Sequence, residues 1–425
     1  MKQPIITSGS FPKNEAELDL LKEDTTLTLY DIPLDHEIED PGIYYHDPEL
    51  PDTAITWQYC AVTVDHQLPD VYYEKLADLY IPPTEEDDDE LKSSNSRRNL
   101  YENLEDEALR ITNNLEEEEN GQEELKGLFS RKSKWRPAGR ITAKGKAIVG
   151  CMVRARRWFT THKGFTDNNG NFSCDGRFRR KANYSIKWER YYWDIRSGNR
   201  GQAYYNGPKQ KSNWNLNINS GKSLRYAFIH QAAYDYFYRN PFGTQKPFEK
   251  RWYRSTLKIG YHHKHGENKG ADFAKWRNWI TYPHIRIYKG QTSNASTTQI
   301  YASTIHELAH SAHWQLIVKA SGSNRIGDFY FADKKLKESW AVGMQTLFSR
   351  NFIDENYDRY GNINTYTRNT SYSELCLELI ETADYSVSEL EQCLIGASNL
   401  DNWQKKINNK YNRDETTLAN IFNRY

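Results

Sequence analysis

Apolar residues recur at helical spacing over one long stretch in the C-terminal half of the chain. From residue 297 to residue 318 the sequence contains no Pro or Gly and carries a broad apolar surface. That surface consists of Ile300, Ile305, Leu308, Ala309, Ala312, Leu316 and Ile317. A helix that is apolar over so much of its circumference is expected to be buried inside the protein.

Shorter periodic segments predict further helices and strands around this helix. Residues 226–238 predict a helix that ends before Pro241, because proline cannot continue a helix. Two strands are predicted, at 255–262 and at 284–288. After the long helix, we expect helices over 338–348, 373–383, 386–395 and 402–411.

The pattern changes between residues 139 and 195, where short β-branched and aromatic runs alternate with Gly, Asn and Asp. This alternation predicts a small β-sandwich. The clearest turn is Thr166-Asp167-Asn168-Asn169-Gly170, since Asn and Gly tolerate a positive φ. Cys151 and Cys174 lie in this region, so a disulfide between two of its strands is an alternative to buried thiols.

The first 130 residues contain few periodic apolar runs and are expected to form an acidic arm with short helices and a linker. Within it, residues 1–66 predict an extended segment that packs on another part of the protein. A short helix is expected over 68–80, with Pro69 in its first turn. The acidic run 85–90 is typical of a linker, and 97–128 predicts a helix in its first half only.

Charge is segregated along the chain, although the formal net charge is zero. Residues 1–125 hold 33 acidic and 8 basic side chains, whereas residues 126–226 hold 24 basic and 4 acidic ones. A basic block of this size is typical of proteins that bind nucleic acid or another polyanion. Because the two blocks are adjacent and nearly matched, we favour neutralisation within the chain over a nucleic-acid partner. The Arg and Trp side chains of the sandwich leave a glycan or cell-surface contact as an alternative.

The long helix carries the residues with the clearest chemistry. It contains His306-Glu307-Leu308-Ala309-His310, a His-Glu-x-x-His motif. Residues four apart lie on one face of a helix, about 6 Å apart along its axis, so both imidazoles can bind the same ion. A buried helix with these polar groups needs partners for them, and one zinc ion supplies such a partner. Glu307 is then the general base beside a zinc-bound water.

His313 lies on the same face of this helix but is a poor third ligand. It is about 10.5 Å along the helix axis from His306. Leu316 stands where the longer motif H-E-x-x-H-x-x-G-x-x-H requires its last His, which disfavours the metzincin class. The third ligand must therefore come from another part of the chain.

From this motif to the next predicted helix, the chain resembles the gluzincin type of zinc metallopeptidase. In that type, a Glu in an E-x-x-A context on the following helix completes the site, and Glu338 with Ala341 matches this context. The 27 residues between His310 and Glu338 are a wider gap than in many members. The resemblance implies that His306, His310 and Glu338 bind one Zn²⁺. The alternative for Glu338 is a helix N-terminal charge that the helix dipole stabilises.

The same resemblance implies an oxyanion donor and a strand that binds the substrate. Four tyrosines follow the second helix, and the sequence does not choose among them: Tyr357, Tyr360, Tyr366 and Tyr372. An edge strand before the active helix commonly holds the peptide backbone in such peptidases. Ile285 and Ile287 are the candidates for that strand.

The β-rich region resembles the carboxypeptidase regulatory-like, transthyretin-like domains of bacterial cell-envelope proteins. The matching segments are Gly139-Arg140-Ile141, Val149-Gly150-Cys151-Met152-Val153, the Thr-Asp-x-x-Gly-x-Phe turn at 166–172 and Tyr184-Ser185-Ile186. Such domains are accessory modules without a catalytic centre. With both features, the chain is similar to bacterial envelope lipoproteins that carry zinc peptidases.

We therefore predict a multi-domain α+β protein. Its expected parts are an acidic arm (1–130), a β-sandwich (136–220) and a zincin-like domain with an active-site helix and closing helices (221–425). The predicted function is that of a zinc metalloendopeptidase acting on a peptide or protein. The alternative is a non-catalytic surface or structural binding protein that keeps a structural metal helix.

The expected location is the cell envelope or the extracellular space. Met1–Ser10 lacks the features of a secretory signal, so this expectation requires a leader that is absent from this chain. A cytoplasmic location or another release route is the alternative. No segment approaches the 18 or more apolar residues of a membrane span.

Overall fold

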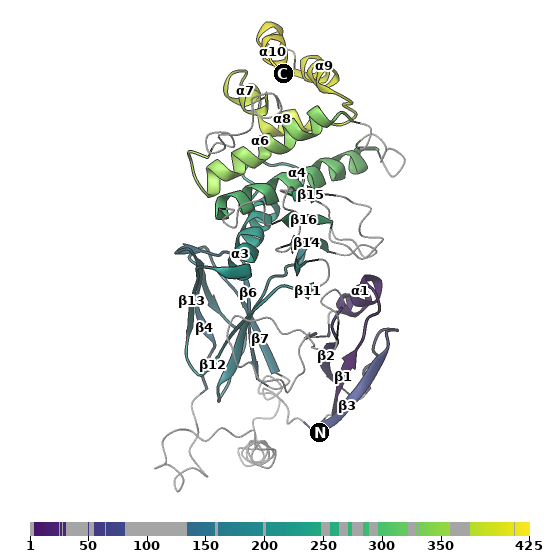
Figure 1. Ribbon diagram of the computed structural model, residues 1–425, viewed down its shortest axis with the longest axis vertical. Helices are drawn as coiled ribbons and strands as arrows, with labels where there is room; N and C mark the ends of the chain where they lie inside the picture. The colour runs from purple at the N-terminus through teal and green to yellow at the C-terminus, as the bar shows by residue number, and fades with distance from the viewer. Residues whose placement is uncertain are drawn as a thin grey trace, which may run out of the picture.

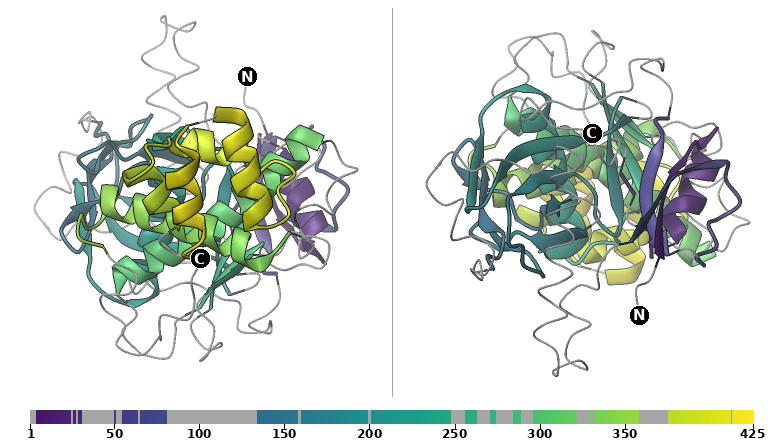
Figure 2. Two further views of the ribbon diagram at one scale, coloured as in Figure 1. Left: turned by 90° about the horizontal axis from the view of Figure 1, so that it is seen from above. Right: turned by 90° about the horizontal axis from the view of Figure 1, so that it is seen from below.

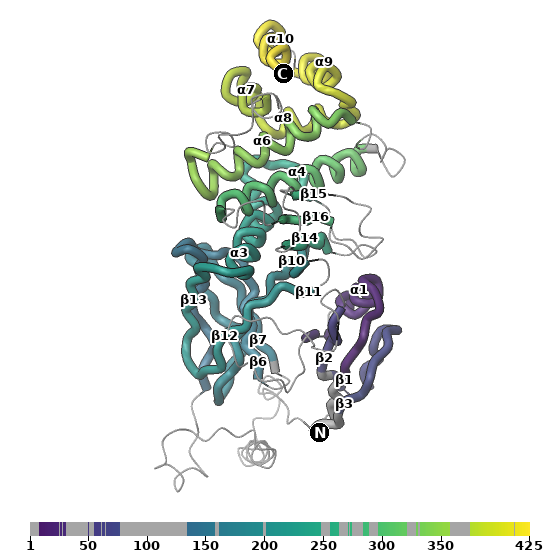
Figure 3. The backbone as a smooth tube through the Cα atoms, in the orientation of Figure 1, coloured from purple at the N-terminus to yellow at the C-terminus, as the bar shows by residue number. Residues whose placement is uncertain are grey.

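The computed structural model has a mixed α+β fold with several small sheets (Figure 1). The residues that it describes are 4–24, 26–27, 29–30, 50, 55–63, 65–80, 134–157, 160–198, 201–247, 256–262, 271–273, 284–288, 296–321, 329, 332–357, 375–411 and 413–425. The N-terminal strands lie at one end of the long axis, and the C-terminal helices lie at the other (Figure 3). Among the described residues, no helix is both long and apolar enough to cross a membrane.

The N-terminal segment is a small folded unit rather than the extended arm that residues 1–66 predicted. Its elements are β1 (Pro4–Ser10), α1 (Glu15–Glu23), β2 (Gln58–Thr63) and β3 (Tyr73–Tyr80). The strands form an antiparallel sheet in the order β2-β1-β3. The side chain of Asn14 caps α1, and Leu18 and Leu21 of this helix are buried.

The helix predicted over 68–80 is wrong, because most of this segment is the strand β3. Its backbone pairs with β1 from Pro4 opposite Tyr80 to Ser10 opposite Tyr73. The open edge of β1 gives these residues hydrogen-bond partners that an isolated segment lacks, so pairing outweighs local helix propensity. The segments 85–90 and 97–128 lie outside the described residues.

Two further sheets lie where the sequence predicted β structure. One has the strand order β12-β9-β6-β7, and the other has the order β13-β4-β5, with β8 paired to β4. The strands are β4 (Ala138–Ala143), β5 (Lys146–Ala147), β6 (Met152–Arg157), β7 (Thr160–Phe165), β8 (Asn171–Ser173), β9 (Ala182–Lys187), β12 (Tyr204–Gln210) and β13 (Trp214–Ile218). Ile141 of the second sheet and Val153 and Ile186 of the first are fully buried in one hydrophobic core.

All five cysteines are free and buried, so the alternative of a Cys151–Cys174 disulfide is wrong. Both thiols belong to the same hydrophobic core. Burial raises the pKa of Cys174 to about 12 and raises the pKa of Cys151 further, which keeps both in the unreactive thiol form.

A five-stranded sheet in the order β11-β10-β14-β16-β15 supports the C-terminal half. Its strands are β10 (Trp193–Ser197), β11 (Gly201–Gln202), β14 (Leu257–His262), β15 (Ala271–Phe273) and β16 (Ile285–Tyr288). β10, β14 and β16 are parallel, whereas β11 and β15 pair antiparallel at the two ends. In the sequence, β10 and β11 fall between β9 and β12 of another sheet, so two strands of the five-stranded sheet come from within the predicted β-sandwich region.

The prediction that Ile285 and Ile287 belong to an edge strand is wrong. Their strand, β16, pairs with β14 on one side and with β15 on the other. The end position belongs to β15, whose three residues are too few to give an alternating pattern in the sequence. Both isoleucines are fully buried.

Helices cover one face of this sheet and continue to the C-terminal end of the molecule (Figures 1 and 2). Next to the sheet lie α3 (Gly221–Tyr234), the π-helical turn η2 (Asp235–Arg239) and α4 (Thr297–Ser321). The remaining helices are α6 (Lys334–Phe352), α7 (Leu375–Glu381), α8 (Val387–Gln392), α9 (Leu400–Tyr411) and α10 (Glu415–Phe422). The long helix, the second helix and the closing helices were all predicted, whereas α10 was not.

The helix α1 contacts β10 and β14 through buried charges. Lys22 Nζ is 2.8 Å from Asp194 Oδ2, and Lys258 Nζ is 2.8 Å from Glu15 Oε2 and 3.1 Å from Asp19 Oδ2. In β10, Trp193 and Ile195 belong to the hydrophobic core, whereas the alternating Asp194 takes part in this ion-pair network. Lys258 lies outside the basic block 126–226, and in the Lys22–Asp194 pair the basic residue comes from the acidic block. The pair of the expected kind is that of Arg196 with Glu15, at 3.8 Å.

Tyr30 of the N-terminal unit packs against the basic strand β6. The guanidinium groups of Arg154 and Arg156 lie 4.2 and 4.7 Å from the centre of the Tyr30 ring. Both arginines are buried, at 2% and 5% exposure, so this part of the basic block is not a free surface for a polyanion.

Candidate metal centre

The helix α4 positions the central motif inside the protein. Its first turn is held by Ser296 and Gln299, whose side chains accept hydrogen bonds from each other's backbone N–H at 3.1 and 3.0 Å. The helix packs against α3, α6, β15 and β16. Because neighbours surround it, nearly every residue from Ile300 to Gln315 is buried, as its apolar pattern predicted.

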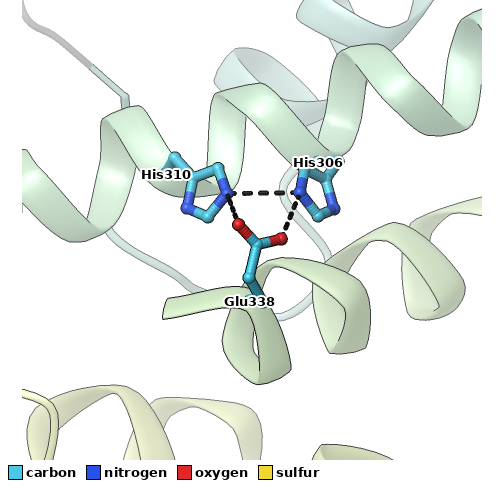
Figure 4. Close-up of side chains that lie close together, drawn as sticks. All are labelled: His306, His310 and Glu338. Carbon is cyan, nitrogen blue, oxygen red and sulfur yellow. Dashed lines mark hydrogen bonds and ion pairs between the residues drawn. The ribbon is translucent and has the colours of Figure 1, made fainter. Parts of the chain in front are cut away.

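Three predicted ligands converge between α4 and α6 (Figure 4). Nε2 of His306 lies 3.2 Å from Nε2 of His310, and the two rings are nearly perpendicular at 86°. The carboxylate of Glu338 reaches both, with Oε2 3.1 Å from His306 Nε2 and Oε1 3.7 Å from His310 Nε2. Each residue offers one ligand atom, and these atoms all lie within 4.8 Å of one another.

The position of Glu338 follows from the start of α6. Asp333 caps this helix by accepting a hydrogen bond from the backbone N–H of Lys335, so Glu338 lies in its second turn. α6 runs alongside α4, and this packing carries Glu338 to the face of α4 that bears the two histidines (Figure 4). Its side chain is 26% exposed, whereas those of His306 and His310 are 12% and 11% exposed.

Gln345 holds His306 from the side away from the cluster. Its Oε1 lies 3.1 Å from Nδ1 of His306, and its Nε2 donates to the hydroxyl of Tyr357 at 2.6 Å. With its Nδ1 proton donated to Gln345, His306 directs a lone pair from Nε2 toward Glu338. The sequence prediction missed Gln345. It follows Glu338 by seven residues, about two helical turns, and this spacing was the signal that both face α4.

The neutral state of His310 suits a divalent cation. Burial, together with the neighbouring His306, lowers the pKa of His310 to about 3, so its imidazole is neutral at pH 7. The buried Nδ1 of His310 has no hydrogen-bond partner among the described residues. Two imidazole nitrogens and a carboxylate at this separation form an electron-rich cluster, and such a donor set fits zinc.

Glu307 and His313 also lie on α4, but neither belongs to this cluster. Glu307 is 5% exposed and follows His306 directly in the helix. His313 is fully buried, its ring meets Phe329 edge to face at 5.2 Å, and burial lowers its pKa to about 3. His313 therefore packs in the interior and is not part of the cluster, which agrees with the distance along the helix that made it a poor third ligand.

The structure describes one of the four predicted oxyanion donors. Tyr357 contacts Gln345 and so lies close to the metal centre, whereas Tyr360, Tyr366 and Tyr372 lie outside the described residues. β15 packs directly against α4, so it places a strand end beside the helix that bears the cluster. The interior position of β16 leaves Ile285 and Ile287 in the hydrophobic core instead.

Comparisons with known proteins identify no relative. No family model matches the chain, and searches among curated proteins and among solved structures also gave no match. The resemblance to gluzincins therefore depends on the motif in the sequence and on the geometry of this cluster.

Proposed function

We propose that the protein is a zinc-dependent metallopeptidase of the gluzincin type. The observation that carries this proposal is the convergence of His306, His310 and Glu338 from two helices. Catalytic zinc sites use three protein ligands and leave a fourth position for water, whereas structural sites use four. Among the described residues, this cluster has three members, which favours a catalytic site over a structural one.

The proposed reaction is hydrolysis of a peptide bond. When bound, zinc polarises the scissile carbonyl and lowers the pKa of a bound water to about 7. Glu307 accepts a proton from the attacking water and delivers it to the leaving amine. Its position favours this role, because the residue directly after the first His of the motif lies beside the water that the metal would bind.

We also propose which neighbouring groups bind the substrate. β15 replaces β16 as the strand that pairs with an extended peptide, because it is the last strand of this sheet among the described residues and packs against α4. Tyr357 is the described candidate for the oxyanion donor, with Tyr360, Tyr366 and Tyr372 as its alternatives.

We propose a domain organisation that matches this function. The sheets β12-β9-β6-β7 and β13-β4-β5 correspond in sequence to the carboxypeptidase regulatory-like sandwich, and α3 to α10 correspond to the zincin-like region. We propose that the protein acts in the cell envelope or outside the cell, on a peptide or protein substrate.

The test is peptide cleavage by the Glu307→Gln variant. This change keeps the shape of the side chain but removes the proton acceptor, so the rate on a peptide library is expected to fall by about 10²- to 10⁴-fold. Zinc content is expected to stay the same. The control is Glu355→Gln, which alters an exposed carboxyl in α6's C-terminal loop and should cleave at the wild-type rate.

Equal cleavage by the wild type and by Glu307→Gln would contradict the catalytic role of this residue. Bound zinc without any cleavage by the wild type would favour the non-catalytic alternative, in which the metal stabilises the α4–α6 pair.

A further inference from the structure

The outer face of the sheet β13-β4-β5 contains a shallow hollow of about 610 Å³, far in sequence from the metal centre. This volume falls within the roughly 300 to 1,000 Å³ of ordinary small-ligand sites. Its polar lining consists of Arg140, Thr142, Asn171, Asn213, Asn215 and Asn217. Nothing in the proposed peptidase chemistry uses these residues.

Asparagine occupies alternate positions along β13 and the residue before it. Asn213, Asn215 and Asn217 are exposed, whereas Trp214 and Ile218 at alternating positions are buried and Leu216 is half-buried. Asn is depleted in strands, where β-branched residues pack better on the pleated surface. Placing three amides on one face therefore disfavours the strand locally, which indicates that the amides serve another purpose.

Hydrogen bonds within the protein fix two of these side chains in advance. Asn217 Oδ1 accepts from Thr142 Oγ1 at 3.1 Å and from the backbone N–H of Gly145 at 3.0 Å, so its NH₂ group remains for a ligand. Arg140 Nε donates to the carbonyl oxygen of Asn169 at 2.9 Å, which leaves the terminal nitrogens of its guanidinium. Such preorganisation reduces the entropy lost on binding.

The register of the strands arranges these groups as a polar grid. Asn215 lies beside Arg140, and Asn217 lies beside Thr142, because β13 and β4 pair in parallel. On the other side, Asn171 of β8 lies opposite Arg140. Neighbouring strands are about 4.8 Å apart, and alternate residues of one strand are about 7 Å apart.

The chemistry of this grid selects the class of ligand. Among the lining residues, none is acidic and one is cationic, which disfavours a metal ion or a basic peptide. Phe172 and Trp214 are only 5% exposed, so the hollow offers no aromatic surface on which nucleobases could stack. An amide donates and accepts hydrogen bonds, as does a sugar hydroxyl, so amides match a polyhydroxylated ligand.

We propose that this hollow binds a neutral oligosaccharide. The binding is independent of the metal centre and would hold the protein on a polysaccharide while the proposed peptidase site acts elsewhere.

The test is affinity electrophoresis of the full chain in native gels that contain laminarin, xylan, galactomannan or soluble starch. At least one polysaccharide is expected to retard the wild type. Asn215→Thr removes an exposed amide but keeps the strand, and it should raise the dissociation constant about tenfold, the effect of losing a ligand hydrogen bond. The matched control is Asn219→Thr, at an exposed position outside the hollow, which should bind as the wild type does.

Two results would overturn the proposal. One is the absence of retardation of the wild type by any of the four polysaccharides. The other is equal retardation of Asn215→Thr and the wild type. Glu307→Gln should be retarded like the wild type, so failure of the peptidase proposal and failure of sugar binding are separate outcomes.

Discussion

At the scale of single residues, the proposed binding of zinc depends on how the two histidines are oriented. His306 is held from behind by Gln345, which is itself fixed by the hydroxyl of Tyr357. An acceptor at Nδ1 fixes both the tautomer and the ring orientation of a metal-binding histidine, and its loss commonly weakens metal binding 10- to 100-fold. We therefore expect Gln345 to act through His306 as a positioning residue.

We expect Gln345→Leu to weaken zinc binding by about 10- to 100-fold, because Nδ1 of His306 loses its acceptor. Gln345→Glu keeps an acceptor at the same place and should bind zinc within a few-fold of the wild type. Competition with a fluorescent chelator measures both affinities. If the two variants bind zinc equally well, Gln345 does not position His306.

The sequence predicted the three residues that converge between α4 and α6, but not the residue that contacts His306 from the other side. His306 and His310 follow from their spacing on one helix, and Glu338 follows from the resemblance to gluzincins. Gln345 was missed because its partner lies 39 residues away in the chain, and its role depends on how α6 packs against α4. The position of β16 inside its sheet was missed for a similar reason, since strand neighbours are set by long-range pairing.

At the scale of elements, α3 and α4 are joined by a buried carboxyl in the π-helical turn η2. Asp235 is fully buried; its Oδ2 accepts from the hydroxyl of Tyr301 at 2.9 Å, and its Oδ1 accepts from Gln231 Nε2 at 2.8 Å. Burial raises the pKa of Asp235 to about 7, although Arg239 at 3.2 Å acts in the opposite direction. Tyr301 precedes His306 by five residues, so this contact fixes the segment of α4 before the metal centre.

The raised pKa of Asp235 predicts a dependence of stability on pH. The folded protein keeps this proton up to about pH 7, whereas an unfolded chain releases it near the ordinary value of 3.8. The stabilisation is therefore complete below about pH 4 and is lost as the pH rises through 7. Between about pH 4 and pH 7, the free energy of unfolding of the wild type should fall relative to that of Asp235→Asn. The expected fall is on the order of a few kcal/mol.

Urea unfolding of both proteins between pH 4 and 8 measures this difference. The control is Glu355→Gln, an exposed carboxyl whose replacement should leave the pH profile parallel to that of the wild type. Parallel profiles for the wild type and Asp235→Asn would contradict a raised pKa at this position.

At the scale of the whole molecule, the N-terminal unit is bound to the central sheet by charge rather than by apolar contact alone. Lys258 and Glu15 are only 3% and 4% exposed, and Arg196 Nη2 lies 3.8 Å from Glu15 Oε2. Burial acts to raise the pKa of Glu15, but Arg196 and Lys258 outweigh it and lower that pKa below its ordinary value. The sequence predicted neutralisation between the two blocks, and the Arg196–Glu15 pair is of that kind. The pairs made by Lys258 and Lys22 could not be predicted from the block charges, because they depend on the placement of α1.

Removing one charged side chain from this network should destabilise the protein, because its charged partners stay buried. We expect Lys258→Met to lower the free energy of unfolding by about 3 to 5 kcal/mol. Adding Glu15→Gln should restore part of the loss by removing the unpaired carboxylate. Glu381→Gln breaks the exposed pair with Arg350 and should change stability by less than about 1 kcal/mol. Equal effects of Lys258→Met and Glu381→Gln in urea unfolding would contradict a buried network.

The central claim is that His306, His310 and Glu338 bind one zinc ion, and metal content tests it most directly. The full chain is incubated with zinc, dialysed and analysed by inductively coupled plasma mass spectrometry. We predict one zinc per chain for the wild type and for the control His162→Ala, and none for His310→Ala or Glu338→Ala. The account is contradicted if the wild type retains no zinc, or if His310→Ala and Glu338→Ala retain as much as the wild type.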